Sequence, residues 1–176
     1  MSSTEHHADQ DEALRASILE LLPRLPDAVV DDWMLDMARG DIWPPAGPRW
    51  YARLAGFSVE QWRNFNWTHE QVDIYKVPFS DDARQIIIGL NEANFGGAVN
   101  GYSNVMNSAS RMRAIYQHIK ATRLLPKSLI LIDDSKWEIV DGCHRVTMYA
   151  AWLRHPELEE GIERKQSAWV ARRDDR

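Results

Sequence analysis

The sequence predicts an α+β protein, in which a small mixed β-sheet with packed helices follows a helical N-terminal extension. Apolar residues recur at helical spacing in several segments between residues 14 and 65, whereas residues 72–79 alternate in polarity as a β-strand does. A continuous apolar run at residues 129–132 precedes a second short apolar stretch at residues 137–140, as expected for buried strands. We therefore expect a helical extension over residues 1–66 and a core domain over residues 67–176.

Prolines divide the N-terminal extension into helices. The first helix presents Leu14, Ile18, Leu21 and Leu22 on one face, and the second, capped by Asp27, presents Val30, Trp33, Met34 and Met37. Three prolines and a glycine in residues 43–48 exclude a helix there and predict a linker. Residues 49–56 and 58–65 then predict two short helices. We expect this extension to pack on the core domain or to form a homodimer or bind a protein partner.

The core domain is expected to alternate strands and helices. The strand at residues 72–79 leads into a helix capped by Ser80 and the two aspartates after it. The inward positions are Ile86, Ile87 and Leu90 in this helix and Met112, Ile115, Tyr116 and Ile119 in the next. Residues 129–132 should form a central strand beside residues 137–140, because they are apolar on both faces. A helix starting at about Cys143 has Val146, Tyr149, Ala150 and Leu153 at helical spacing, which gives it an apolar face. A closing strand at residues 167–171 completes the domain.

Residues 94–110 form a long stretch rich in glycine and asparagine. Loops of this length in a compact domain are often lids or substrate-binding elements. We expect it to close over a small polar substrate, with Asn100, Tyr102, Ser103 and Asn104 as hydrogen-bonding residues. The alternative is a passive surface insertion, since asparagine and glycine together are also ordinary turn residues.

The most informative segment joins the strand at residues 137–140 to the following helix through Asp141, Gly142, Cys143, His144 and Arg145. The first turn of a helix presents backbone N–H groups without helical acceptors and the positive end of the helix dipole. With His144 and Arg145 beside them, these groups are suited to a phosphate. A tight turn with an ordinary N-cap is the structural alternative.

This Asp-Gly-Cys-His-Arg motif before an apolar helix resembles the signature of the ParB/sulfiredoxin-like proteins, whose strand-to-helix turn binds nucleotide phosphates. Sulfiredoxins carry Gly-Cys-His-Arg with a catalytic cysteine, which Cys143 would match. The free-serine-kinase-like branch carries Asp-Gly-x-His-Arg, so Asp141 makes the sequence more similar to that branch. The resemblance covers the core domain and implies the same order of elements, although residues 94–110 are longer than the family pattern.

Composition restricts the partners and the compartment. A net charge of −5 argues against nucleic acid as the main partner, and no apolar run is long enough to span a membrane. We therefore expect a cytoplasmic protein with a small-molecule substrate. The single cysteine excludes an internal disulfide, so Cys143 is either inert or a reactive thiol. Most of the eight tryptophans should serve packing.

The first functional hypothesis is ATP-dependent phosphoryl transfer to a small hydroxyl-bearing metabolite, assisted by Mg²⁺. The phosphates would lie at residues 142–145, with Arg145 spreading charge from the transferring group and Asp141 serving as a magnesium or supporting carboxylate. The candidate bases are Glu70, Asp81, Asp82 and Glu92. The alternative for each is a purely structural role as a helix cap or a solvent-exposed charge. The resemblance to the serine-kinase branch favours Glu70, the nearest glutamate to the predicted first strand.

Two alternatives remain open. In a sulfiredoxin-like repair reaction, Cys143 would attack an ATP-activated sulfinic acid, and the helix N-terminus with His144 and Arg145 would lower its pKa. In a nucleotide-switched binding protein, the same turn would hold a nucleotide without turnover. The absence of a predicted helix-turn-helix after the motif makes DNA a poor candidate partner for such a switch.

Overall fold

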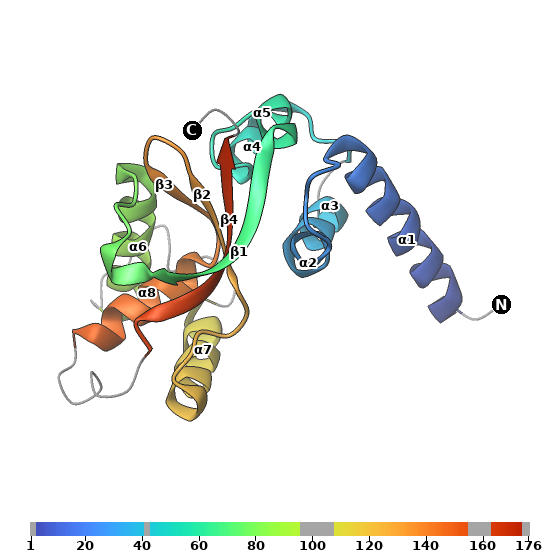
Figure 1. The fold of residues 1–176 in the computed structure, drawn as a ribbon. Coiled ribbons are helices and arrows are strands. Elements are labelled where there is room, and N and C mark those ends of the chain that lie inside the picture. Colours follow the sequence, from blue (N-terminus) through green and yellow to red (C-terminus); the bar gives the residue numbers. More distant parts are fainter. Residues whose placement is uncertain (1–2, 41–42, 96–107, 155–162, 174–176) are drawn as a thin grey trace. The chain divides into compact units, whose positions relative to one another are not determined.

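The computed structural model of the chain describes residues 3–40, 43–95, 108–154 and 163–173 (Figure 1). Within these residues the protein is α+β, with helices and a four-stranded mixed sheet, as the sequence predicts. The chain divides into two compact units, one formed by Met1–Thr68 with Ala171–Arg176 and the other by His69–Val170. The boundary that we expected after residue 66 falls inside the first strand.

The N-terminal unit contains the predicted helices. They are α1 (Ser3–Leu21), α2 (Asp27–Val29), a π-helical turn (Val30–Met34), α3 (Leu35–Gly40), α4 (Gly47–Arg53) and α5 (Val59–Arg63). The expected cap at Asp27 is wrong, because Pro26 occupies the N-cap position and Asp27 is the first helical residue. A carboxylate there still suits the positive end of the helix. Ser58 forms a capping box with Gln61 at the start of α5.

Tryptophans form the centre of this unit. Trp33 stacks on Trp62 with 5.6 Å between the ring centroids, and both side chains are buried. The Trp62 indole N–H donates to the backbone oxygen of Leu54 at 3.1 Å, which satisfies the only polar group of this buried ring. These contacts agree with the packing role predicted for most tryptophans.

The sheet and the remaining helices follow along the chain. They are β1 (Phe65–Asp73), a 3-10 turn (Ile74–Lys76), α6 (Asp81–Phe95), α7 (Ser108–Thr122), β2 (Leu129–Asp133), β3 (Trp137–Asp141), α8 (Cys143–Leu153) and β4 (Lys165–Arg173). The strands lie in the order β1-β4-β2-β3. Strand β2 therefore lies between two others, which confirms the predicted central strand.

The predicted position of the first strand is only partly right. Strand β1 begins at Phe65 and ends at Asp73, so it overlaps only the start of residues 72–79. The chain then makes a 3-10 turn, and Phe79 forms a single parallel bridge with Trp137. Proline at position 78 lacks the N–H group that a continuous strand would need.

Helices α6, α7 and α8 pack beside the sheet in the second unit (Figure 1). They share a buried core with one face of the strands. It includes Ala83, Met112, Ile115, Ile119, Leu129, Leu131, Ile139, Val146, Met148, Trp152, Ala168 and Val170. Leu129 and Leu131 contribute to this core at alternate positions of β2, while Ile130 and Ile132 are also buried. Burial on both faces explains why β2 is a continuous apolar run.

Strands β2 and β3 are antiparallel, and their pairing contains an irregularity next to the motif. Leu131 pairs with Ile139, whereas Ile130 pairs with Asp141, so the register shifts by one residue and leaves Val140 between the two pairs. Such a bulge bends a strand locally and redirects the residues after it. Strand β3 therefore bends immediately before Gly142.

Candidate functional site

Gly142 joins β3 to α8 in a conformation that only glycine adopts easily. Its φ angle is 111°, in the left-handed region. A β-carbon at this position would lie 2.4 Å from Cδ2 of Leu129, and 3.1 Å from Nε and Nη2 of Arg145. Since Leu129 is completely buried, its side chain has little room to withdraw. Backbone conformation and packing thus both require glycine here.

The N-terminus of α8 has no side-chain cap. The Val146 N–H donates to the Gly142 oxygen at 2.9 Å, as the first hydrogen bond of the helix. The N–H groups of residues 143–145 precede this bond and have no acceptor within α8. An anion placed at this end would meet these donors and the positive end of the helix dipole.

Arg145 occupies a different environment from the one we expected. Its side chain is only 10% exposed, and its guanidinium donates to the backbone oxygen of Pro126 at 3.1 Å and to Oδ2 of Asp141 at 2.5 Å. The guanidinium of Arg145 is therefore largely buried and bound to acceptors within the protein. Arg145 connects the turn to the segment before β2, while Asp141 remains 42% exposed.

Arg145→Ala should lower the free energy of unfolding by about 2 kcal/mol, because the Pro126 oxygen and the Asp141 carboxylate would lose a charged donor. Partial hydration of Asp141 keeps the loss below that of a fully buried ion pair. Urea unfolding measures the change, and the exposed Arg113→Ala on α7 is the matched control, expected within about 0.5 kcal/mol of the parent. Unchanged stability in Arg145→Ala would show that the guanidinium is not structural.

Cys143 is the first residue of α8 and packs partly buried against the core. Burial raises the pKa of its thiol to about 11, and the negative charge of Asp141 raises it further than Arg145 lowers it. The expectation of a lowered pKa is therefore wrong, because loss of hydration outweighs the helix N-terminus at this position. The thiol is protonated at neutral pH.

His144 lies beside the same helix end. Burial lowers the pKa of its imidazole, and the positive charge of Arg111 on α7 adds to this effect, although Asp141 opposes it. Its Nε2 atom is buried and has no hydrogen-bond partner among the described residues. His144 and the exposed Arg111 thus place polar and positive groups near the N–H donors of α8.

The structure places Glu70, Asp81 and Asp82 away from this turn. Glu70 lies on β1, and β4 and β2 separate that strand from β3. Asp81 and Asp82 open α6, whose N-terminus adjoins Trp137, at the opposite end of β3 from Asp141. Asp81 forms an exposed ion pair with Lys136 at 3.4 Å, and Glu92 is exposed on α6. The predicted substrate residues Asn100, Tyr102, Ser103 and Asn104 lie outside the described residues.

Glu138 is a carboxylate that sequence reasoning missed. It lies partly buried on β3 and accepts a hydrogen bond from the Ser80 hydroxyl at 2.6 Å, while Ser80 caps α6 by accepting from the Ala83 N–H at 3.1 Å. Burial raises the pKa of Glu138, and the nearby charge of Asp82 acts in the same direction. A charged residue within the otherwise apolar stretch at residues 137–140 was the available signal.

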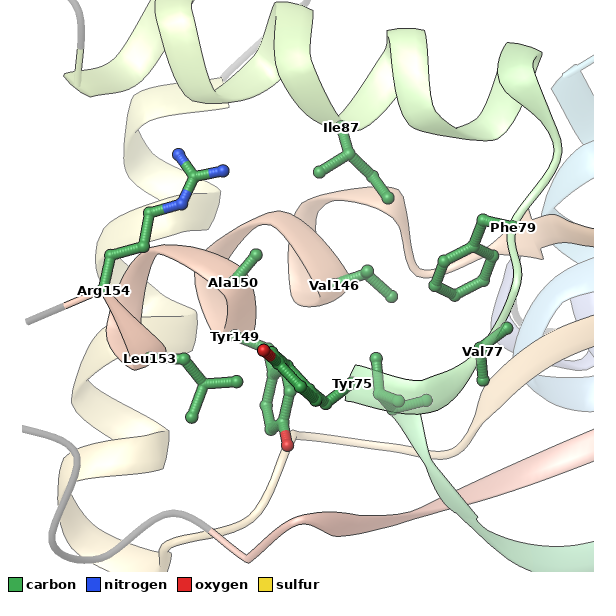
Figure 2. Close-up of a pocket in the computed structure, with 10 residues that line it drawn as sticks. Tyr75, Val77, Phe79, Ile87, Val146, Tyr149, Ala150, Leu153 and Arg154 are labelled. Carbon is green, nitrogen blue, oxygen red and sulfur yellow. The ribbon is translucent and has the colours of Figure 1, made fainter.

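An apolar groove of about 430 Å³ lies between α6 and α8 (Figure 2). It is formed by the 3-10 turn after β1, by α6 and by α8, and the residues that line it include Tyr75, Phe79, Ile87, Val146, Tyr149 and Arg154. Val146 and Tyr149 belong to the inward face that the sequence predicted. The groove beside these residues depends on how α6, α8 and the 3-10 turn pack together, and the spacing of apolar residues in the sequence does not predict that packing.

Comparison of the chain with protein-family models, with curated proteins and with solved structures gives no significant match. The resemblance to the ParB/sulfiredoxin-like proteins therefore depends on the motif and the order of elements, and it stays a prediction. Within the described part of the chain, no helix is both long and apolar enough to cross a membrane. The described residues also contain no group of three or more histidine, cysteine or acidic side chains arranged to hold a metal ion.

Proposed function

We propose that the protein binds ATP or a related nucleotide through its phosphates at the Gly142 turn, and transfers a phosphoryl group to a small hydroxyl-bearing metabolite. The observation that carries this proposal is the uncapped N-terminus of α8 behind a glycine whose position excludes a side chain. Helix ends of this kind suit phosphate groups. The resemblance to the free-serine-kinase-like branch makes L-serine the first acceptor to test.

In this proposal the turn contributes positioning and charge, which dominate phosphoryl transfer. The N–H groups of residues 143–145 bind phosphate oxygens, and Arg111 supplies positive charge nearby. Arg145 acts as a positioning residue, because it holds Asp141 and the turn. Asp141 is exposed enough to share a magnesium ion with the nucleotide, and one or two carboxylates suffice for such an ion.

Glu138 lies beside Ser80 at the same end of β3 as Asp81 and Asp82, so it lies away from the Gly142 turn as they do. Burial raises the pKa of Glu138, because the charged carboxylate loses hydration there. Asp81 and Glu92, by contrast, are exposed. We therefore assign no general base among these carboxylates.

The sulfiredoxin-like alternative has less support, because a nucleophilic cysteine requires an accessible thiolate. A pKa of about 11 leaves Cys143 protonated at neutral pH. A nucleotide-switched binding protein would use the same turn without turnover. Detection of phosphorylated L-serine after incubation with ATP and Mg²⁺ separates transfer from binding alone.

A thermal-shift screen with ATP, ADP, CTP and GTP in the presence of Mg²⁺ tests the nucleotide site. A nucleotide at one hundred times its dissociation constant should stabilise the native protein by about 2.7 kcal/mol, which is readily seen as a higher melting temperature. No shift with any of the four nucleotides would exclude the proposed function.

Two arginines on α7 provide a matched pair for locating the site. Arg111 and Arg113 are both exposed, and two residues along a helix place them on different faces. Only Arg111 is close enough to His144 to affect its pKa. Arg111→Gln should therefore reduce the nucleotide-induced shift, whereas Arg113→Gln should preserve it. Equal shifts in the two variants would place the nucleotide elsewhere.

A further inference from the structure

The apolar groove between α6 and α8 has the dimensions of a ligand site. Its volume of about 430 Å³ falls in the range of roughly 300–1,000 Å³ that is typical for small molecules. Its walls are largely aliphatic and aromatic, and they come from the 3-10 turn, from α6 and from α8 (Figure 2). A folded protein segment would need a longer surface, so the volume favours a small molecule.

Two side chains give the groove its chemical character. Tyr75 lines it although 73% of the residue is exposed, so an aromatic face is available to a ligand. Arg154, at the end of α8, is the charged residue of the lining and is exposed. Among the described residues, no carboxylate forms an ion pair with Arg154. Figure 2 shows Arg154 at one end of the groove and Phe79 at the other.

We propose that this groove binds a small molecule with an aromatic body and one anionic group. The aromatic body lies on Tyr75 and among Phe79, Ile87 and Val146, which removes apolar surface from water on both sides. The anionic group meets the guanidinium of Arg154, whose donors suit a carboxylate or a sulfonate. This inference goes beyond the proposed function and does not depend on it, because the groove contains none of residues 141–145.

The test uses two fluorescent probes with the same aromatic body and the full-length protein. Anilinonaphthalene sulfonate carries one anionic group, and phenylnaphthylamine is its neutral counterpart. Both should bind at one site with enhanced fluorescence. Arg154→Gln should weaken binding of the sulfonate about tenfold, as expected for one charge-assisted hydrogen bond, while the neutral probe changes by less than about twofold. Arg113→Gln, which removes an exposed arginine outside the groove, should affect neither probe.

A second variant tests the location. Ala150 lines the groove and is partly exposed, so Ala150→Trp fills the cavity from a wall rather than from the core. It should weaken both probes at least tenfold while circular dichroism and the melting temperature stay near those of the parent. Undiminished binding to a folded Ala150→Trp variant would overturn the proposal. The proposal would also be overturned if Arg154→Gln and Arg113→Gln lost equal affinity for the sulfonate, or if neither lost any. Arg154 would then serve only as a favourable charge at the C-terminus of α8.

Discussion

Gly142→Ala should destabilise the protein by roughly 3–5 kcal/mol, the largest loss that we expect from a single methyl group. The alanine would have to adopt a φ angle of 111°, and its β-carbon would approach Cδ2 of Leu129 to 2.4 Å. Backbone strain in this region costs about 1–3 kcal/mol, and overpacking of a dense core adds a similar amount. Amide hydrogen exchange in β2 measures the effect, since 3 kcal/mol corresponds to exchange more than about a hundredfold faster.

Gly47 provides the matched control for this prediction. It also has a positive φ angle, 77°, but a β-carbon there would meet nothing within 4 Å. Gly47→Ala should therefore lower the free energy of unfolding only by the cost of the left-handed backbone conformation, about 1–2 kcal/mol as measured by urea unfolding. Shortening Leu129 to valine in the Gly142→Ala background should recover part of the loss, because it removes the overlapping atom. If the two glycine variants lose equal stability, packing against Leu129 does not constrain the turn.

Cys143 should react with iodoacetamide about a hundredfold more slowly in the native protein than in urea at neutral pH. Its thiol has a pKa of about 11 instead of the ordinary 9.0, so about a hundredfold less thiolate is present. Mass spectrometry follows the label directly, because the chain has one cysteine. The rate in the native protein should increase as the pH rises towards 11.

The same thiol connects stability to pH and separates the functional alternatives. Its pKa is higher in the folded than in the unfolded state, so its contribution to stability is present below pH 9 and is lost as the pH rises towards 11. Cys143→Ser should preserve phosphoryl transfer, since the backbone donors of the turn remain. Fast alkylation at neutral pH, or loss of activity in Cys143→Ser, would bring back the sulfinic acid repair hypothesis.

Local patterns predicted most of the fold. The apolar run of β2 and the spacing of Val146 and Tyr149 in α8 reflect burial, which determines both the residue types and the structure. The start of β1 was missed because only Phe65 is buried among residues 65–71, which are otherwise mostly polar. The clearer alternation after Val72 leads into a 3-10 turn. Pairing with a distant strand can impose a β-strand on residues whose own pattern does not predict one, and a single sequence does not show such pairing.

The candidate site was less predictable, because its properties depend on distant residues. The motif is recognisable in the sequence, but the side chain of Arg145 donates to the backbone oxygen of Pro126, which lies 19 residues earlier in the chain. The raised pKa of Cys143 likewise results mainly from burial against the core, with the charge of Asp141 as the second cause. Sequence alone thus identified where a turn forms, but not which of its side chains remain available.

The bulge between β2 and β3 makes the length of this junction critical. The loop between Asp133 and Trp137 lies at the end of the hairpin, where an added or removed residue changes no pairing further along the strands. At Val140, by contrast, loss of one residue would remove the bulge and with it the local bend of β3 before Gly142. Homologues of this chain should therefore vary in length at the hairpin and keep the interval from Ile139 to Gly142 constant, which offers a criterion for recognising relatives even where the motif residues have changed.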